Sequence, residues 1–125
     1  AATFATPDGE RIRSIHFGVG TGELLADMHA TGGDVQGVDD RIPLDEAARR
    51  LPGVPLQGNI DPAVLFAGDE VRARHVRDVV RRGAAAPAHI VNLGHGVPPE
   101  ADPQVLTRLV ELVHSLPGSG EVESA

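Results

Sequence analysis

The residue best suited to chemistry in this sequence is His95, which follows an apolar, β-branched stretch at residues 88–93 and has a glycine on each side. The stretch has the length and composition of a buried strand. Gly94 and Gly96 allow a sharp turn and keep other side chains away from the imidazole. At the carboxyl end of a parallel strand, an imidazole can donate a hydrogen bond or transfer a proton near neutral pH. The alternative is a loop histidine that only caps the backbone, and we favour the functional interpretation.

A second polar string, Gln-Gly-Asn-Ile-Asp-Pro at residues 57–62, follows an earlier apolar stretch. Gln57, Asn59 and Asp61 could line a site and orient a polar ligand there. Asparagine and aspartate at these positions are equally typical of an Asx-type turn that leads into a helix. The spacing alone favours the turn.

A third candidate is the acidic pair Asp39 and Asp40, which could bind a divalent cation or imitate the acidic pocket of a phosphoacceptor domain. A phosphoacceptor domain also needs a lysine, and the sequence has none. Together with Asp61 and His95 the pair would give an oxygen-rich metal site. No diagnostic ligand spacing supports such a site, so we predict no metal and a solvated loop in which Asp39 pairs with Arg41.

Two further groups give weaker signals. The glycine-rich residues 18–22 resemble a dinucleotide-binding loop, but Glu23 stands where the third glycine of G-x-G-x-x-G belongs, which leaves only a possible anion contact. Four other histidines have no evident partners in the sequence, and we expect them to be packing residues: His16, His75, His89 and His114.

Composition narrows the function classes. The net charge of −7 argues against nucleic acid or an anionic membrane as a partner. The absence of cysteine excludes a disulfide framework, a thiol nucleophile and a thiolate metal site. No apolar run reaches the roughly 20 residues of a membrane span, and no signal-peptide pattern is present, so we expect a cytoplasmic protein.

The elements that must position these residues alternate regularly. We expect one domain with a lead-in at residues 1–13, four βα units at residues 14–116 and a flexible tail at residues 117–125. The order βαβαβαβα predicts an α/β fold with a parallel sheet and right-handed crossovers. Two architectures fit this pattern: half of an eight-stranded (β/α)8 barrel, or a small open parallel sheet.

Four strings in order along the chain carry a family resemblance: residues 15–25, residues 37–39 with 43–47, residues 57–62 and residues 92–97. They resemble the C-terminal half of the uroporphyrinogen decarboxylase family, over nearly all of the chain from Ile15 to Leu116. Gln-Gly-Asn-x-Asp-Pro and Asn-Leu-Gly-His-Gly are the most specific strings. Asp40 departs from the family pattern, in which a bulky aromatic is common at this position.

The resemblance implies a (β/α)8 TIM barrel of which this chain supplies roughly the last four units. It implies a carboxy-lyase that converts uroporphyrinogen to coproporphyrinogen for heme and porphyrin biosynthesis by decarboxylating the four acetate side chains, with neither a metal nor an organic cofactor. His95 matches the family histidine near the substrate carboxylates, and these residues are expected to line the same site: Gly94, Gly96, Gln57, Asn59, Asp61 and Asp39.

The resemblance also implies what this chain lacks. The family's catalytic aspartate, arginine cluster and active-site tyrosine lie upstream and have no counterpart here, so no residue of this chain is assigned a catalytic role. Its strand-tip loops contain one arginine, Arg41. We therefore expect the isolated chain to bind tetrapyrrole weakly and to be nearly inactive. The expected partners are the N-terminal half of the barrel and, in the complete enzyme, a second copy in a homodimer.

Two other function classes stay open. One is a non-catalytic half-barrel that acts as an interaction or assembly module, because an isolated four-stranded sheet has two unpaired edges. The other is a relative that transfers methyl groups to corrinoid or thiol acceptors. Such relatives generally need zinc held by histidine and cysteine, and the absence of cysteine argues against this class.

Overall fold

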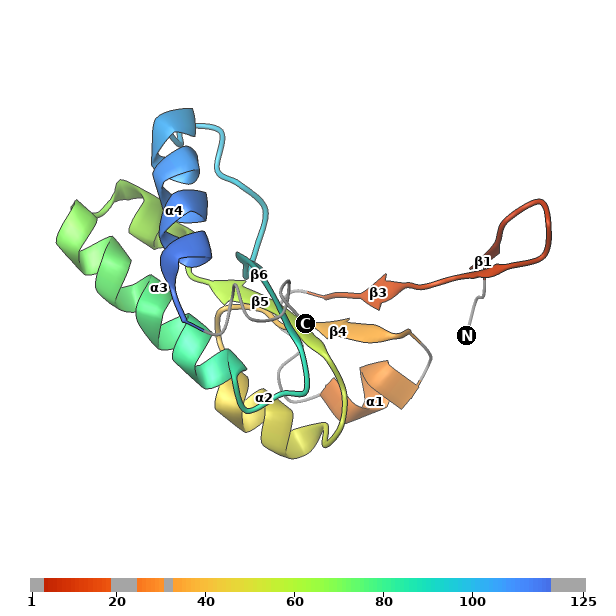
Figure 1. Cartoon of the computed structure of the whole chain (residues 1–125). Helices are drawn as coiled ribbons and strands as arrows, with labels where there is room; N and C mark the ends of the chain where they lie inside the picture. The colour runs from red at the N-terminus through yellow and green to blue at the C-terminus, as the bar shows by residue number, and fades with distance from the viewer. Residues whose placement is uncertain (1–3, 19–24, 31–32, 118–125) are drawn as a thin grey trace.

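The fold is built on a four-stranded parallel sheet whose strand order follows the chain (Figure 1). The structure is a computed structural model and describes residues 4–18, 25–30 and 33–117. The strands are β3 (Ile15–His16), β4 (Val35–Gly37), β5 (Leu56–Ile60) and β6 (His89–Leu93). The longest pairing joins β5 to β6, from Leu56 opposite His89 to Ile60 opposite Leu93.

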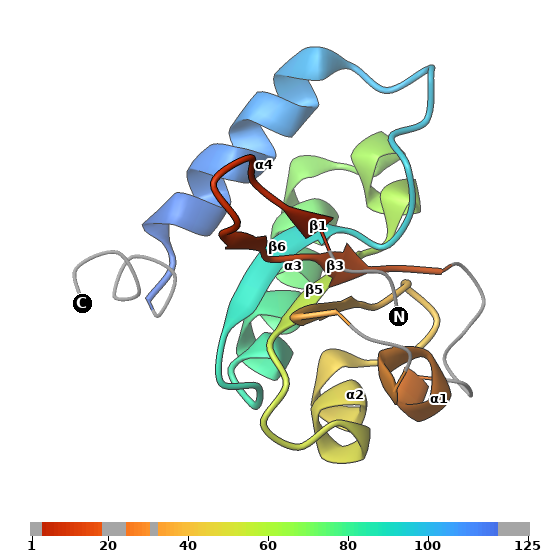
Figure 2. The ribbon, with the colours of Figure 1, turned by 90° about the vertical axis from the view of Figure 1, so that its right-hand side faces the viewer.

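A helical segment follows each strand, and consecutive helices pack on one another. The segments are α1 (Leu25–Ala30), α2 (Leu44–Arg50), the 3-10 helix η2 (Pro62–Phe66), α3 (Asp69–Gly83) and α4 (Pro103–Ser115). Figures 1 and 2 show the helices in an arc along one side of the sheet. A doubly wound sheet has helices on both faces and a strand order that reverses at a switch point. The observed order is that of consecutive units of a barrel, so the predicted partial barrel is confirmed.

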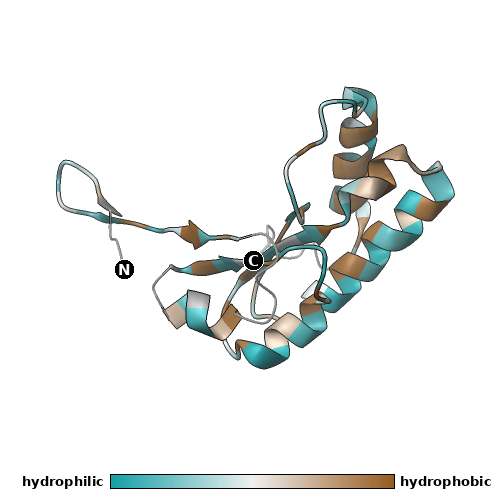
Figure 3. Ribbon diagram, turned by 180° about the vertical axis from the view of Figure 1, so that it is seen from behind, coloured by the Kyte–Doolittle hydropathy of each residue, from teal (hydrophilic) through white to brown (hydrophobic). Residues whose placement is uncertain are grey.

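The hydrophobic core lies between the sheet and this arc of helices. Leu56 and Ile60 of β5 are fully buried, as are Leu44 of α2 and Val76 of α3. Apolar and polar residues alternate around α3 and α4 (Figure 3), as expected of helices with one face on a core. Helix α4 is capped by the residue before it, because Asp102 Oδ1 accepts a hydrogen bond from the Gln104 N–H at 2.9 Å.

The opposite face of the sheet carries exposed apolar side chains. Ile15, Phe17 and Ile90 are 46%, 41% and 45% exposed. The registers place Ile90 beside Gln57, on the side of the sheet opposite Leu56, because side chains alternate between the two faces of a strand. We call this side of the sheet the open face, and in a closed barrel it would be the interior.

The lead-in contains a β-hairpin that the sequence interpretation did not anticipate. Strands β1 (Phe4–Ala5) and β2 (Arg11–Ile12) pair antiparallel, and the hairpin extends away from the helices in Figure 1. The Gly9 N–H donates to the Thr6 carbonyl at 2.9 Å and closes the turn. Arg11 is tied to Asp34, before β4, by two guanidinium–carboxylate hydrogen bonds of 2.5 and 3.1 Å.

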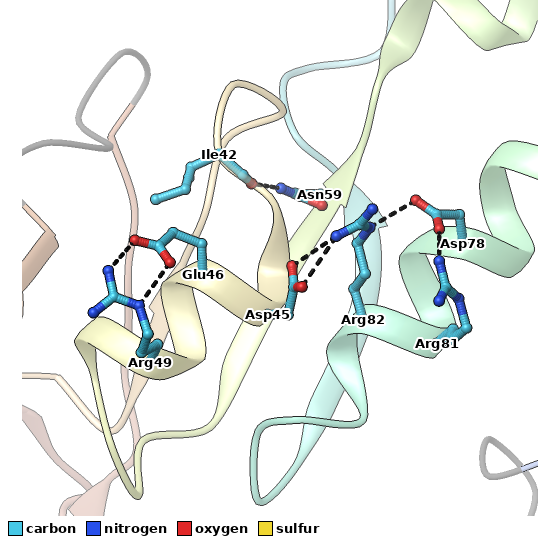
Figure 4. A network of polar contacts seen from close by, with 8 residues as sticks. All are labelled: Ile42, Asp45, Glu46, Arg49, Asn59, Asp78, Arg81 and Arg82. Atoms are coloured by element: carbon cyan, nitrogen blue, oxygen red, sulfur yellow. Dashed lines mark hydrogen bonds and ion pairs between the residues drawn. The ribbon is translucent and has the colours of Figure 1, made fainter.

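An ion pair between Asp45 and Arg82 joins helices α2 and α3 on the outer surface, and further ion pairs lie within each helix (Figure 4). Arg82 of α3 donates to Asp45 of α2 at 3.0 Å and to Asp78 of its own helix at 2.8 Å. Within α2, hydrogen bonds from Arg49 and then Arg50 lower the pKa of Glu46 to about 2. These side chains are exposed or half-buried, so each pair contributes little to the stability of the fold.

Candidate functional site

Three loops meet at the edge of the sheet where the parallel strands end. Residues 38–42 follow β4 and are called the β4 loop, Asp61 follows β5, and residues 94–96 follow β6 and are called the β6 loop. The Gly94 N–H donates to the Ile60 carbonyl at 2.7 Å, which extends the β5–β6 pairing beyond β6. We call these three segments the carboxyl edge.

The β4 and β6 loops are in direct contact across the end of β5. A Cβ atom on Gly94 would lie 2.5 Å from the Asp40 backbone nitrogen and 2.9 Å from Asp40 Cα. Glycine is therefore required at position 94 because a backbone segment occupies the space a side chain would fill. This contact brings Asp40 and His95, which are far apart in the sequence, to adjacent loops.

Asn59 fixes the backbone of the β4 loop. Its side chain is 6% exposed, and its Nδ2 donates to the carbonyl oxygens of Asp39 at 2.8 Å and Ile42 at 2.5 Å (Figure 4 shows the Ile42 contact). The observed contacts of this predicted site-lining residue are thus with the loop backbone. The two hydrogen bonds fix both ends of a turn on which residues 40 and 41 are exposed.

The polar string at residues 57–62 lies mainly in β5 and not in a loop. Gly58 has φ +136°, and a Cβ there would lie 2.5 Å from the Val38 carbonyl oxygen, so only glycine fits where β5 passes the β4 loop. Gln57 is half-buried on the open face, beside Ile90. Asp61 Oδ1 accepts from the Ala63 N–H at 2.9 Å and caps η2, which confirms the Asx-type turn.

Asp39 is buried at 2% exposure, so the prediction of a solvated loop at this residue was wrong. Its Oδ1 accepts a hydrogen bond from the Arg41 backbone N–H at 3.1 Å, and its carbonyl accepts from Asn59. The contact between Asp39 and Arg41 thus involves the backbone amide and tightens the turn.

Two of the histidines predicted to be packing residues also form hydrogen bonds, one to β5 and one to the residue after it. His75 Nε2 accepts from the Asp61 N–H at 3.1 Å, and His89 Nε2 lies 2.6 Å from the Gly58 carbonyl oxygen. The His89 ring occupies the space beside Gly83, where a Cβ would approach its Nδ1 to 2.1 Å. Burial lowers the pKa of His89, and the hydrogen bond to Gly58 opposes this shift. No sequence pattern identifies either partner.

His95 and Gly96 are exposed at the carboxyl edge, whereas Gly94 is buried. In the part of the chain that the structure describes, the His95 imidazole forms no hydrogen bond and no ion pair. The ring is therefore accessible to a ligand that the neighbouring loops would position.

The acidic residues of the carboxyl edge do not form a metal-binding cluster. Among residues 4–18, 25–30 and 33–117, no three histidine, aspartate or glutamate side chains gather closely enough to hold an ion. Asp39 is engaged in its turn and Asp61 caps η2. Most of the glycine-rich loop at residues 18–22 lies outside the described residues.

Comparison with known proteins decides the family. The family model described as Uroporphyrinogen decarboxylase (URO-D) matches residues 2–116. The chain belongs to the uroporphyrinogen decarboxylase family. The matched residues include the four strands of the parallel sheet and the whole carboxyl edge, so the sequence resemblance is confirmed over the region that forms the candidate site.

Curated uroporphyrinogen decarboxylases are closely similar to this chain. The protein of Leifsonia xyli subsp. xyli is 64% identical over 115 residues, which is 88% of this chain and 30% of the relative. An Arthrobacter relative is 65% identical over 103 residues, 82% of this chain and 30% of the relative. That of Saccharopolyspora erythraea is 58% identical over 117 residues, 88% and 32% respectively. The chain thus spans about a third of the length of these relatives.

The described part of this uroporphyrinogen decarboxylase family member has no helix that is both long and apolar enough to cross a membrane. The structure places the predicted site residues in three groups. His95 and Gly96 are exposed in the β6 loop, Gln57 and Asp61 are half-buried, and Asn59, Asp39 and Gly94 are buried. Sequence reasoning did not detect the contact between Asp40 and Gly94, since no pattern shows two loops crossing the end of a third strand.

Proposed function

We propose that this chain is part of a uroporphyrinogen decarboxylase, a carboxy-lyase that converts uroporphyrinogen to coproporphyrinogen in heme and porphyrin biosynthesis. Its carboxyl edge contributes one side of the tetrapyrrole site. In a chain of this family, the observation that supports the proposal best is an exposed His95 held beside the β4 loop by the Gly94 contact. We propose a cytoplasmic location on family membership alone.

His95 binds a carboxylate of the substrate in this proposal. A neutral imidazole donates one hydrogen bond to a carboxylate oxygen, and a protonated one adds a favourable charge. The glycines at 94 and 96 fix the loop without covering the ring. Gln57, on the open face, lines the same site from the adjacent strand. We assign no catalytic group to the described residues, because the resemblance places the catalytic aspartate and the arginine cluster upstream.

The rest of the barrel is the proposed macromolecular partner. Strands β3 and β6 are the two edges of the sheet, and Ile15, Phe17 and Ile90 expose apolar area on the open face. Eight strands close a barrel of this type, and the sheet supplies four. The N-terminal half of the barrel pairs with both edges and covers this face, and the complete enzyme is a homodimer. The chain alone, with a net charge of −7, binds the polyanionic substrate weakly.

The test is decarboxylation of uroporphyrinogen by this chain, alone and mixed with the N-terminal barrel half of the Leifsonia xyli relative. We expect activity only in the mixture. His95→Ala removes a hydrogen bond to a charged group, so kcat/KM falls by about 10- to 100-fold. The matched control is His114→Ala, an exposed histidine on α4, which leaves the activity unchanged. Equal activity in the two variants would refute the role of His95.

A second candidate function is an assembly module without catalysis. The open edges and the apolar face favour association whether or not a site forms. Sedimentation of the same mixture separates the two functions. A mixture that assembles into one species and decarboxylates nothing would support the assembly module and refute the enzymatic proposal.

A further inference from the structure

The β4 loop is held from three directions, which makes it a fixed support for the side chains it carries. Asn59 donates to the carbonyls of Asp39 and Ile42, at the two ends of the turn. The buried Asp39 carboxylate accepts from the Arg41 N–H at 3.1 Å. The Gly94 backbone lies against the backbone of Asp40. Residues 40 and 41 are exposed on this fixed turn, next to the loop that carries His95.

Arg41 differs from most other arginines in the described residues because no carboxylate pairs with it. Seven arginines have an aspartate or glutamate within ion-pair distance: Arg11, Arg49, Arg50, Arg72, Arg81, Arg82 and Arg108. Arg13, Arg74 and Arg77 also lack an ion pair, but Arg13 precedes β3 and the other two lie in α3. Arg41 is thus the one arginine at the carboxyl edge of the described sheet, and its charge is available to a ligand.

We propose that Arg41 binds a second carboxylate of the tetrapyrrole, beside the one assigned to His95, and that Asp40 weakens this binding. The inference rests on the proposed function. A guanidinium can bind a carboxylate through two parallel hydrogen bonds. The backbone contact between Gly94 and Asp40 places the turn that carries Arg41 beside the loop that carries His95. A substrate with carboxylates on neighbouring side chains matches such a pair. Asp40, exposed on the same turn, repels the same substrate.

The test uses the chain mixed with the N-terminal barrel half and measures KM and kcat for uroporphyrinogen. We expect Arg41→Gln to raise KM by about 10- to 100-fold, because a charge-assisted hydrogen bond to the substrate is lost, and to leave kcat nearly unchanged. Arg41→Lys keeps the positive charge but cannot form the two parallel hydrogen bonds of a guanidinium, so we expect its KM to lie between those of the parent and Arg41→Gln. Asp40→Asn lowers KM, which a purely structural role of the turn would not produce. The matched control is Arg74→Gln, an exposed and unpaired arginine of α3, which leaves KM unchanged.

A binding measurement makes the inference independent of turnover. Uroporphyrin, the oxidised and fluorescent form of the substrate, is titrated into the isolated chain and each variant at low and high salt. Arg41→Gln weakens binding, Asp40→Asn strengthens it, and both differences shrink in high salt. An Arg41→Gln chain that binds and turns over like the parent overturns the inference while the activity of the mixture still supports the proposed function. An inactive parent mixture overturns the proposed function, and the titration then decides the role of Arg41.

Discussion

Replacing Asn59 by aspartate substitutes a hydrogen-bond acceptor for a buried donor in a side chain of the same shape. In the parent, Nδ2 donates to two carbonyl oxygens at 2.8 and 2.5 Å from a side chain that is 6% exposed. An ionised carboxylate places an oxygen where the donor was, so three acceptors face one another in a buried space. Asn59→Ala removes the donor but adds no charge.

Each lost hydrogen bond contributes about 1 kcal/mol, and a carbonyl left buried without a donor adds more, so Asn59→Ala lowers the free energy of unfolding by about 2–4 kcal/mol. Asn59→Asp costs about 1–2 kcal/mol beyond this at neutral pH, because the charge is buried as well. Only the protonated carboxyl can donate, so its folded pKa rises above the unfolded value. The extra cost of Asn59→Asp is therefore largest at neutral pH and shrinks as the pH falls towards that folded pKa.

Urea unfolding followed by far-UV circular dichroism, between about pH 7.5 and pH 5, measures these differences against the parent. The matched control is Asn92→Asp. Asn92 lies opposite Asn59 in the β5–β6 register, but it is exposed and its Oδ1 accepts from the Leu93 N–H, a contact that a carboxylate preserves. We expect this control to stay within about 0.5 kcal/mol of the parent. If Asn59→Asp were as stable as Asn92→Asp at neutral pH, Asn59 would not anchor the β4 loop.

Two further predictions concern the same edge of the sheet. Gly94→Ala forces its Cβ to 2.5 Å from the Asp40 backbone, so we expect it to lower the free energy of unfolding in urea by about 1–3 kcal/mol. Gly96→Ala is the control and is expected to be neutral, because the space around the added Cβ is open. Equal stabilities of the two variants would contradict the loop contact. Burial lowers the pKa of His89, so its stabilising contribution is present above the unfolded value of 6.5 and is lost as the pH falls through the folded pKa. His89→Gln therefore flattens the fall in stability below about pH 6.5, while an unchanged slope would show that His89 is not the group responsible.

Local patterns along the sequence predict most of the fold. The helical period and the Asp102-Pro103 start predict α4, and glycine and proline positions separate the units. The sequence places the polar string at residues 57–62 after the apolar stretch, because a glycine and an asparagine lower strand propensity. In the structure, β5 continues through this string to Ile60. The close approach of Gly58 to Val38 and the two hydrogen bonds of Asn59 outweigh that preference. Those partners come from another part of the chain, which no local pattern contains.

The sequence predicts where the candidate site lies but not the contacts that hold its loops together. The glycines beside His95 identify the loop, and the parallel order places it at the same edge as Asp39 and Asp61. The sequence does not show that Asp39 is buried, because an acidic pair beside an arginine usually indicates a solvated turn. The roles of Gly94 and Asn59 depend on a contact between two loops that are separated by an intervening strand.

The sequential strand order has a consequence for how the chain acquires its structure. Each strand of the sheet pairs with the next strand along the chain, and the connection between the two strands contains a helical segment. Because a crossover helix separates each pair of parallel strands, residues that pair are 20 to 33 positions apart, as in Gln36 with Leu56 and Leu56 with His89, and folds dominated by such non-local contacts form slowly. During synthesis, each new unit can dock on the one that has just emerged from the ribosome, so the sheet grows in the order of translation. The His95 loop, at the end of the last strand, is then placed against a β4 loop that Asn59 has already set.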